Sequence, residues 1–226
     1  MRTRVIAGLL LVPLLMLIIL GGTPLYIGEA IIIAIALNEF YKAFEEKDIK
    51  PLYYIGYIFS IYLLIKNYLE LSISYTYTLI FILFLIAIIP ILTLRKNIMD
   101  IVVTFFGIFY VGVLIDFIIL TMDNFDMGKI YVWLIFIIAF ATDTCAYFAG
   151  YAFGKHKLIP KVSPKKTIEG SIVAQVGDLF ASSVKRYVGI KDYGKLIPGH
   201  GDILDRFDSV ILVAPFVYSI INLFIK

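Results

Sequence analysis

Residues that build the commoner kinds of catalytic centre are scarce in this chain. Its 226 residues include one cysteine, Cys145, and two histidines, His156 and His200. A single cysteine excludes an intramolecular disulfide framework and a cysteine-cluster metal site, and two histidines are too few for a histidine-rich zinc site. The sequence also has no glycine-rich Walker loop, no GxSxG elbow and no HExxH motif. Nucleophilic and zinc-hydrolase mechanisms therefore have no support.

Charge is also scarce, while apolar residues are abundant. Charged residues make up 16% of the chain and apolar residues 61%, and the mean hydropathy is +0.95. A soluble domain has about 25% charged and about 45–50% apolar residues. The composition therefore predicts a membrane protein.

The apolar residues are gathered in stretches long enough to cross a bilayer, for which about 20 residues are needed. We read the N-terminus as a retained first span, because no small-x-small cleavage site follows it. The stretches lie at roughly 5–21, 24–40, 52–65, 74–93, 101–121, 130–153 and 209–225. We predict an all-α polytopic membrane protein with about seven transmembrane helices and one short re-entrant or partial helix at about 171–184.

Lysine and arginine in the loops predict the orientation of the chain. With a cytoplasmic N-terminus, 17 of these residues fall on the cytoplasmic side and only Lys66, Lys129 and Lys226 on the outer side. Cytoplasmic loops carry such an excess of positive charge. We divide the chain into N-terminal transmembrane helices, about five spans over 1–129, and a region 130–226 that holds the polar motifs. The stretch Lys185–Asp208 alone carries nine charged residues and His200.

The aspartates Asp143 and Asp116 lie inside apolar segments. Asp143 is more than ten residues into its segment, and an intramembrane carboxylate is a functional candidate by default. A structural carboxylate, hydrogen-bonded between helices, is the alternative. For Asp116, nearer the outer end of its segment, we favour the structural role.

In the stretch KVSPKKTIEGS, a possible turn or helix start is followed by two lysines. Ser163 and Pro164 suit a turn or a helix start, and Lys165 and Lys166 follow. Lysines and backbone donors at a helix start suit phosphate oxygens. A positively charged anchor on anionic lipid headgroups remains the alternative.

A third cluster combines carboxylates with cations near the C-terminus. If 176–187 is helical, Asp178, Ser182, Lys185 and Arg186 share one face. Asp205 and Asp208 are three residues apart, so they can project together at the head of the last span. Mg²⁺ binds through one or two carboxylates plus substrate phosphates, and lysine and arginine take the remaining phosphate charge. A juxtamembrane ion-pair network is the alternative, but it needs no glycines such as Gly189, Gly194, Gly199 and Gly201.

These residues closely resemble a family signature. SSVKR at 182–186, KDYG at 191–194, IPGHG at 197–201 and LDRFD at 204–208 are similar to the signature of phosphatidate cytidylyltransferases, the CDP-diacylglycerol synthases. The upstream DTCAYFAGYAFGK and SPKKTIEG stretches also look like this family, and the specific resemblance covers roughly 130–215. It implies that CTP and phosphatidic acid are converted to CDP-diacylglycerol and pyrophosphate.

The resemblance also implies roles for particular residues and a Mg²⁺ cofactor, with K⁺ as a further expectation. The candidate metal ligands are Asp178, Asp205 and Asp208, with Asp143 as a further candidate. The candidate catalytic residues are Asp178, Lys185, Arg186, Asp205, Asp208 and His200, and His200 would orient a phosphate or a carboxylate. The candidate phosphate-binding residues are Lys165, Lys166, Lys191, Arg206 and Ser182.

The chain departs from the family pattern at two places. Asp202 stands where the signature has a second glycine after His200-Gly201. Only SIVAQV separates Glu169-Gly170 from Gly177-Asp178, where the family has tens of apolar residues. Six residues rise about 9 Å, far short of a bilayer.

We therefore expect a multi-pass protein of the cytoplasmic membrane whose active site faces the cytoplasm. Its expected partners are CTP, phosphatidic acid, membrane lipids and a second copy in a homodimer, with no nucleic acid. Two alternatives remain: a CTP-dependent enzyme acting on another lipid phosphate or a polyprenol, and a non-catalytic membrane protein such as a degenerate family member.

Overall fold

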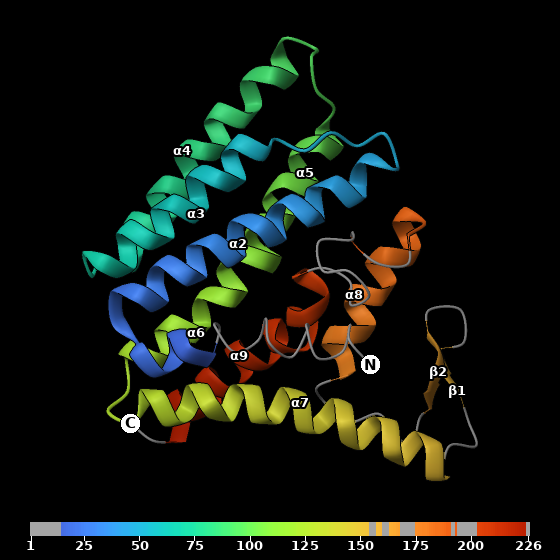
Figure 1. The fold of residues 1–226 in the computed structure, drawn as a ribbon. Coiled ribbons are helices and arrows are strands. Elements are labelled where there is room, and N and C mark those ends of the chain that lie inside the picture. The colour runs from blue at the N-terminus through green and yellow to red at the C-terminus, as the bar shows by residue number, and fades with distance from the viewer. Residues whose placement is uncertain are drawn as a thin grey trace.

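The computed structural model describes residues 15–153, 157–159, 163–167, 175–190, 193 and 203–224. Residues 15–20 are helical and lead into the main bundle. The further elements are α2 (Gly22–Glu45), α3 (Tyr53–Tyr68), α4 (Ile73–Leu92), α5 (Ile98–Gly107), the π-helical η1 (Ile108–Val113), α6 (Leu114–Asp123), α7 (Gly128–Phe153), β1 (Lys157–Ile159), β2 (Ser163–Thr167), α8 (Gln175–Val188) and α9 (Leu204–Phe224) (Figure 1).

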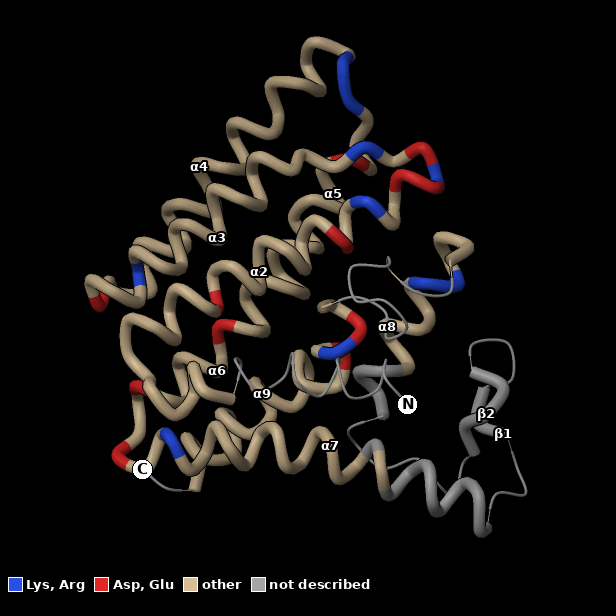
Figure 2. The backbone as a smooth tube through the Cα atoms, in the orientation of Figure 1, with Lys and Arg blue, Asp and Glu red and all other residues tan. Residues whose placement is uncertain are grey.

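The predicted all-α membrane fold is confirmed. Each predicted apolar segment from residue 24 onward contains a helix, and α8 occupies the place of the predicted partial helix. Within the described ranges, four helices are long and apolar enough to cross a bilayer: α2, α4, the continuous α5–η1–α6 and α9. Charged positions lie mainly near the ends of these helices (Figure 2), as a bilayer requires.

Two glycines separate the first helical segment from α2. Gly21 and Gly22 both have positive φ, 64° and 53°, a conformation that other residues adopt only with strain. The N–H of Gly21 still bonds to the carbonyl of Leu17 at 2.9 Å, so the first helix closes before the chain turns. The chain therefore turns at two glycines between the first helical segment and α2.

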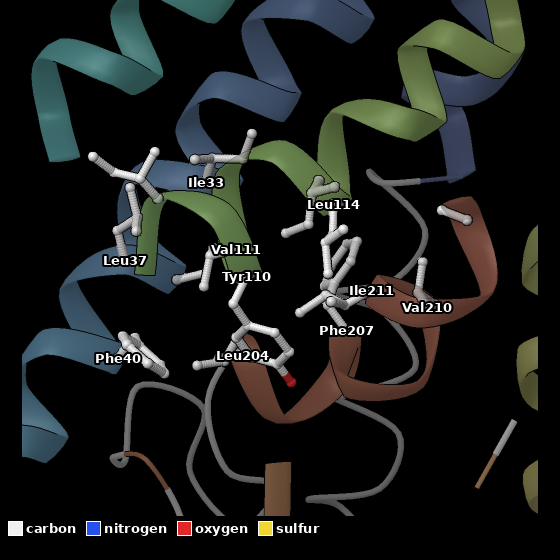
Figure 3. Close-up of a cluster of buried hydrophobic side chains, with 14 of the residues drawn as sticks. Ile33, Leu37, Phe40, Tyr110, Val111, Leu114, Leu204, Phe207, Val210 and Ile211 are labelled. Carbon is white, nitrogen blue, oxygen red and sulfur yellow. The ribbon is translucent and has the colours of Figure 1, made fainter. Parts of the chain in front are cut away.

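Part of the buried core lies where α2, the η1–α6 segment and α9 meet. Figure 3 shows Leu37 and Phe40 of α2 close to Val111 of η1, with Leu204 and Phe207 of α9 on the other side. These residues are at most 5% exposed. Because α9 also packs on α6, α7 and α8, its N-terminal end is fixed beside α2 and α8.

The region after α7 contains a small antiparallel hairpin of β1 and β2. The expected turn or helix start at Ser163-Pro164 is wrong, because both residues belong to β2. Proline disfavours the helical conformation of the residue before it, and a two-stranded sheet leaves an edge where its missing N–H does no harm. Lys165 and Lys166 therefore lie on a strand, not at a helix N-terminus.

Candidate active site

Helix α8 confirms the predicted helix over 176–187 and carries cations near its C-terminal end. Ser182 and Lys185 are half-buried and Arg186 is exposed, whereas Ala181 and Val188 are buried. Lys185 is four residues after Ala181 and three before Val188, so it lies on the buried side of the helix. This side of α8 is anchored, and Arg186 lies at its solvent-exposed edge.

A glycine ends α8 and turns the chain towards α9. Gly189 has φ +88°, and the N–H groups of Gly189 and Ile190 both bond to the carbonyl of Lys185, at 3.0 and 2.9 Å. A left-handed glycine after the last helical residue is the usual way to satisfy the final carbonyls. Arg186 adds a hydrogen bond from Nη1 to the carbonyl of Ile190 at 3.1 Å. This turn fixes the direction in which the signature stretch leaves α8.

The ammonium of Lys185 and the carboxylate of Asp205 form an ion pair between α8 and α9. Nζ lies 2.7 Å from Oδ1, and each side chain is only 11% exposed. The other oxygen, Oδ2, accepts the backbone N–H of Tyr193 at 3.3 Å, and Nζ lies 5.5 Å from the centre of the Tyr193 ring. Asp205 is thus held from α8 and from the intervening segment. A pair so little exposed fixes geometry more than it adds stability.

Asp205 and Asp208 both lie in the first two turns of α9. Asp208 is half-buried, and its Oδ1 accepts the N–H of Ser209 at 2.8 Å. Negative charge is favourable at the N-terminus of a helix, where the backbone dipoles point their positive ends. Arg206, between the two aspartates, is exposed. Two carboxylates and two cations, Lys185 and Arg206, therefore surround the start of α9.

Glu39 of α2 holds the N-terminus of α9 in place. Its Oε1 accepts the N–H of Ile203 at 3.2 Å and its Oε2 that of Leu204 at 2.8 Å, and the residue is 7% exposed. The first N–H groups of a helix have no partner within the helix, so this carboxylate acts as a cap supplied from another helix. Glu39 thereby positions the turn that carries Asp205. Sequence patterns do not assign this role to Glu39; the signal for it is a glutamate inside the apolar segment 24–40.

Aromatic side chains form the wall behind this charged group. Tyr193 is 5% exposed, and its ring centre lies 6.4 Å from that of Phe40. Tyr110 of η1 lies 5.0 Å from Phe180 of α8 by the same measure. Burial raises the pKa of the Tyr193 hydroxyl above its ordinary value, and the nearby carboxylates add to this shift. Tyr193 is therefore neutral at physiological pH and serves as a packing surface.

The structure brings together only part of the predicted site. Lys185 and Asp205 are in contact, and Asp208, Arg186, Arg206 and Ser182 lie on the same two helices. Lys191 and His200 lie outside the described residues, and so does Asp202. For four other candidates the structure gives the backbone only; these are Asp143, Asp178, Lys165 and Lys166.

The described donor atoms fit a magnesium ion better than a zinc ion. Among the side chains that the structure describes, no group of three or more His, Cys, Asp and Glu residues is placed to hold a metal. Asp205 and Asp208 nevertheless supply two carboxylates on adjacent turns. The carboxylate of Asp205 accepts from the ammonium of Lys185 and from the N–H of Tyr193, which orient it. Mg²⁺ needs only one or two protein carboxylates when substrate phosphates and waters supply the rest.

Comparison with known proteins agrees with this arrangement of motifs. The sequence profile of the Cytidylyltransferase family matches residues 2–174 and 171–224. A phosphatidate cytidylyltransferase of Staphylococcus haemolyticus is 34% identical over 257 residues, which covers 95% of each chain. That of Bacillus subtilis is 33% identical over 150 residues, and that of Staphylococcus aureus 35% identical over 158 residues. These two alignments cover 51% and 54% of this chain, and 56% and 60% of the relatives.

Both kinds of match agree with a shortened connection before α8. The alignment with the S. haemolyticus protein runs over 257 residues, more than the 226 of this chain, so that protein has residues with no counterpart here. The two pieces of the family match overlap at 171–174, within the stretch where the sequence departs from the family pattern. Together they cover residues 2–224, nearly the whole chain, and the chain belongs to the Cytidylyltransferase family.

Proposed function

We propose that this multi-pass membrane protein makes CDP-diacylglycerol and pyrophosphate from CTP and phosphatidic acid, as a step in phospholipid biosynthesis. The observation that carries the proposal is the Lys185–Asp205 contact, which brings the two ends of the signature stretch together at the head of α9. The family match and the names of the relatives support the same activity. The reaction transfers the cytidylyl group to the lipid phosphate.

The cations of the site suit a reaction between two phosphate compounds. A phosphatidate oxygen attacks the α-phosphorus of CTP, the bond to the β-phosphate oxygen breaks, and pyrophosphate leaves. Phosphatidate is already ionised, so the reaction requires no protein nucleophile and no general base. What it requires is alignment of two polyanions and neutralisation of their charge. Lys185, Arg186 and Arg206 would neutralise phosphate charge, and His200 would orient a phosphate or a carboxylate.

Four further residues would bind substrate phosphates in this proposal. Lys165 and Lys166 belong to β2, Ser182 to α8, and Lys191 to the segment between α8 and α9. Ser182 is one turn before Lys185 on α8, so a phosphate that contacts Lys185 lies within reach of the Ser182 hydroxyl. The bound position of CTP would decide which phosphate each of these residues contacts.

Asp205 and Asp208 would hold a Mg²⁺ ion, with Asp178 and Asp143 as further candidate ligands. When bound, the ion would neutralise charge on the phosphates and on the leaving pyrophosphate. The contacts of Lys185 and Tyr193 with Asp205 orient that carboxylate before any ligand is present. K⁺ is the candidate for a second, monovalent ion.

The loop charges support a cytoplasmic site in the cytoplasmic membrane. In the predicted topology, 17 of the 20 lysines and arginines fall on the side that holds the C-terminal end of α8 and the N-terminal end of α9. CTP and pyrophosphate would then be exchanged with the cytoplasm, while phosphatidic acid arrives within the bilayer. A homodimer is the expected assembly, which the molar mass in detergent would test.

The test is product formation by purified protein in detergent with Mg²⁺, CTP and phosphatidic acid. We expect pyrophosphate release and CDP-diacylglycerol, and a loss of at least about a hundredfold in turnover for Asp205→Asn. Asp126→Asn is the matched control, because Asp126 is an exposed aspartate in the α6–α7 turn. No product from the wild type, or unchanged turnover of Asp205→Asn, would refute the proposal.

The short connection at 170–177 and Asp202 favour one further candidate, a family member that has lost activity. Calorimetry of CTP binding distinguishes the two, since an inactive relic would show no Mg²⁺-dependent affinity for CTP. A related enzyme that uses another lipid phosphate or a polyprenol would bind CTP in the same way. A panel of lipid acceptors separates that case from phosphatidate specificity.

A further inference from the structure

A second polar cluster is buried inside the helix bundle. It consists of Glu29 on α2, Lys66 and Asn67 near the end of α3, and Asp116 on α6, each at most 8% exposed. The proposed active site uses none of these residues. Lys66 falls on the outer side in the predicted topology, but the structure places it within α3 and buried. Ionisable groups at such depth are costly unless they pair or bind something.

Three hydrogen bonds link the four side chains. Nζ of Lys66 donates to Oδ2 of Asp116. The amide nitrogen of Asn67 donates to Oδ1 of Asp116 at 3.0 Å and to Oε2 of Glu29 at 3.1 Å. An asparagine amide group has two N–H donors, and both are used here. Asp116 therefore has a cation and an amide as partners, whereas Glu29 has the amide alone.

The remaining oxygen of Glu29 has no hydrogen-bond partner among the described residues. Glu29 also lines a cavity of about 20 Å³, and the other lining residues are all apolar, including Ile32, Ile115 and Phe136. That volume could hold one water, but a buried water needs two to four polar partners, which this apolar lining does not supply. The cavity therefore gives Oε1 no solvation.

The charges of the cluster do not balance if both carboxylates are ionised. Lys66 supplies one positive charge against two negative charges, and the cation is bonded to Asp116. An unpaired carboxylate out of contact with water takes up a proton instead of staying charged. Asp116 has the ammonium as a direct partner and Glu29 has only the amide, so the proton belongs on Glu29. Because Oε2 already accepts from Asn67, the proton belongs on Oε1.

We propose that Glu29, Asn67, Asp116 and Lys66 form an intramembrane proton-binding site, with one proton carried on Oε1 of Glu29. The cluster is then electrically neutral as a whole. The charged groups that face Glu29 are Asp116 and, farther along α6, Asp123, together with Lys66 from α3. The proposal is independent of the catalytic one, since it depends only on this charge count and burial.

The test compares Glu29→Gln with Asp116→Asn by thermal unfolding in detergent at neutral pH. If Glu29 is protonated, Gln replaces a neutral group of the same shape, and the melting temperature stays within about 1 °C of the wild type. Asn at position 116 leaves Lys66 buried without its carboxylate, which should lower the melting temperature by about 10 °C. An equal, large loss in both variants would mean that Glu29 is ionised, and would overturn the proposal.

Two further measurements keep the proposal testable if Asp116→Asn does not fold. The infrared difference between the wild type and Glu29→Gln should contain the C=O band of a protonated carboxyl group, and its absence overturns the proposal. The wild type should also lose melting temperature as the pH rises, because the folded protein holds a proton that the unfolded chain releases. Glu29→Gln should remove that part of the slope. Stabilisation by Na⁺ or K⁺ at constant ionic strength, absent in Glu29→Gln, would instead assign a metal cation to the site.

Discussion

Replacing Glu39 tests whether a cap from one helix positions the proposed catalytic end of another. In the structure its two carboxylate oxygens accept the N–H groups of Ile203 and Leu204, directly before Asp205. Glu39→Ala removes both acceptors and leaves two N–H groups without partners in a region where Leu204 is fully buried. Hydrogen bonds to a charged group are worth about 1.5–3 kcal/mol each, and caps about 1 kcal/mol. We expect a loss of about 3 kcal/mol in the free energy of unfolding.

For a chain of this size, such a loss lowers the melting temperature by about 6–12 °C. Glu39→Gln keeps one acceptor oxygen but turns an NH₂ group towards the other N–H, so about half of that loss is expected. Glu46→Ala is the control, because Glu46 is an exposed glutamate just beyond the same helix. Thermal unfolding in detergent measures all three variants.

A positioning role also predicts a change that lost stability alone does not produce. Without the cap the first turn of α9 loosens, so the Mg²⁺ concentration for half-maximal product formation should rise in Glu39→Ala and less in Glu39→Gln. This is measured below the melting temperature of each variant. A melting temperature equal to that of Glu46→Ala, with unchanged Mg²⁺ dependence, would refute the reasoning.

The other predictions concern the turn after α8, the buried tyrosine and the topology. Gly189→Ala should lower the melting temperature by about 2–4 °C, because alanine is strained at φ +88°; no change would argue against that turn. Burial raises the pKa of Tyr193, so the folded protein keeps a proton that the unfolded chain loses above about pH 10. Above that pH the wild type should therefore lose more stability than Tyr193→Phe. Identical pH profiles of the two proteins would contradict this. In a Cys145→Ser background, an impermeant maleimide added outside intact cells should label Asp126→Cys and not Lys47→Cys, and the reverse pattern would invert the topology.

The sequence predicts the helices because their signals are local. An apolar run of about 20 residues marks each long helix, and the spacing of Ser182, Lys185 and Arg186 on one face marks α8. The sequence does not show that Lys185 and Asp205 are in contact, but the motif places both residues in one candidate site. The Ser163-Pro164 error arose because proline suits both a helix start and an edge strand, and only the partner strand decides between them.

The interactions that sequence patterns could not predict join residues that are far apart along the chain. Glu39 meets the start of α9 across more than 160 residues, and Lys66 meets Asp116 across 50. Lys66 resembled a loop cation because it follows an apolar run, while α3 in fact continues past it. Glu29 and Glu39 were detectable only as two carboxylates in the apolar segment 24–40, a signal that names no partner.

The central claim, that the chain transfers a cytidylyl group to phosphatidate, is tested most directly by following the phosphates of CTP. Purified protein with Mg²⁺ and phosphatidic acid is supplied with CTP labelled at either the α- or the γ-phosphate. The account predicts that the α-label enters the lipid product while the γ-label leaves with pyrophosphate, and that Asp205→Asn abolishes the transfer. Label from the γ-phosphate in the lipid would identify a kinase, and no label in the lipid from either position would contradict catalysis altogether.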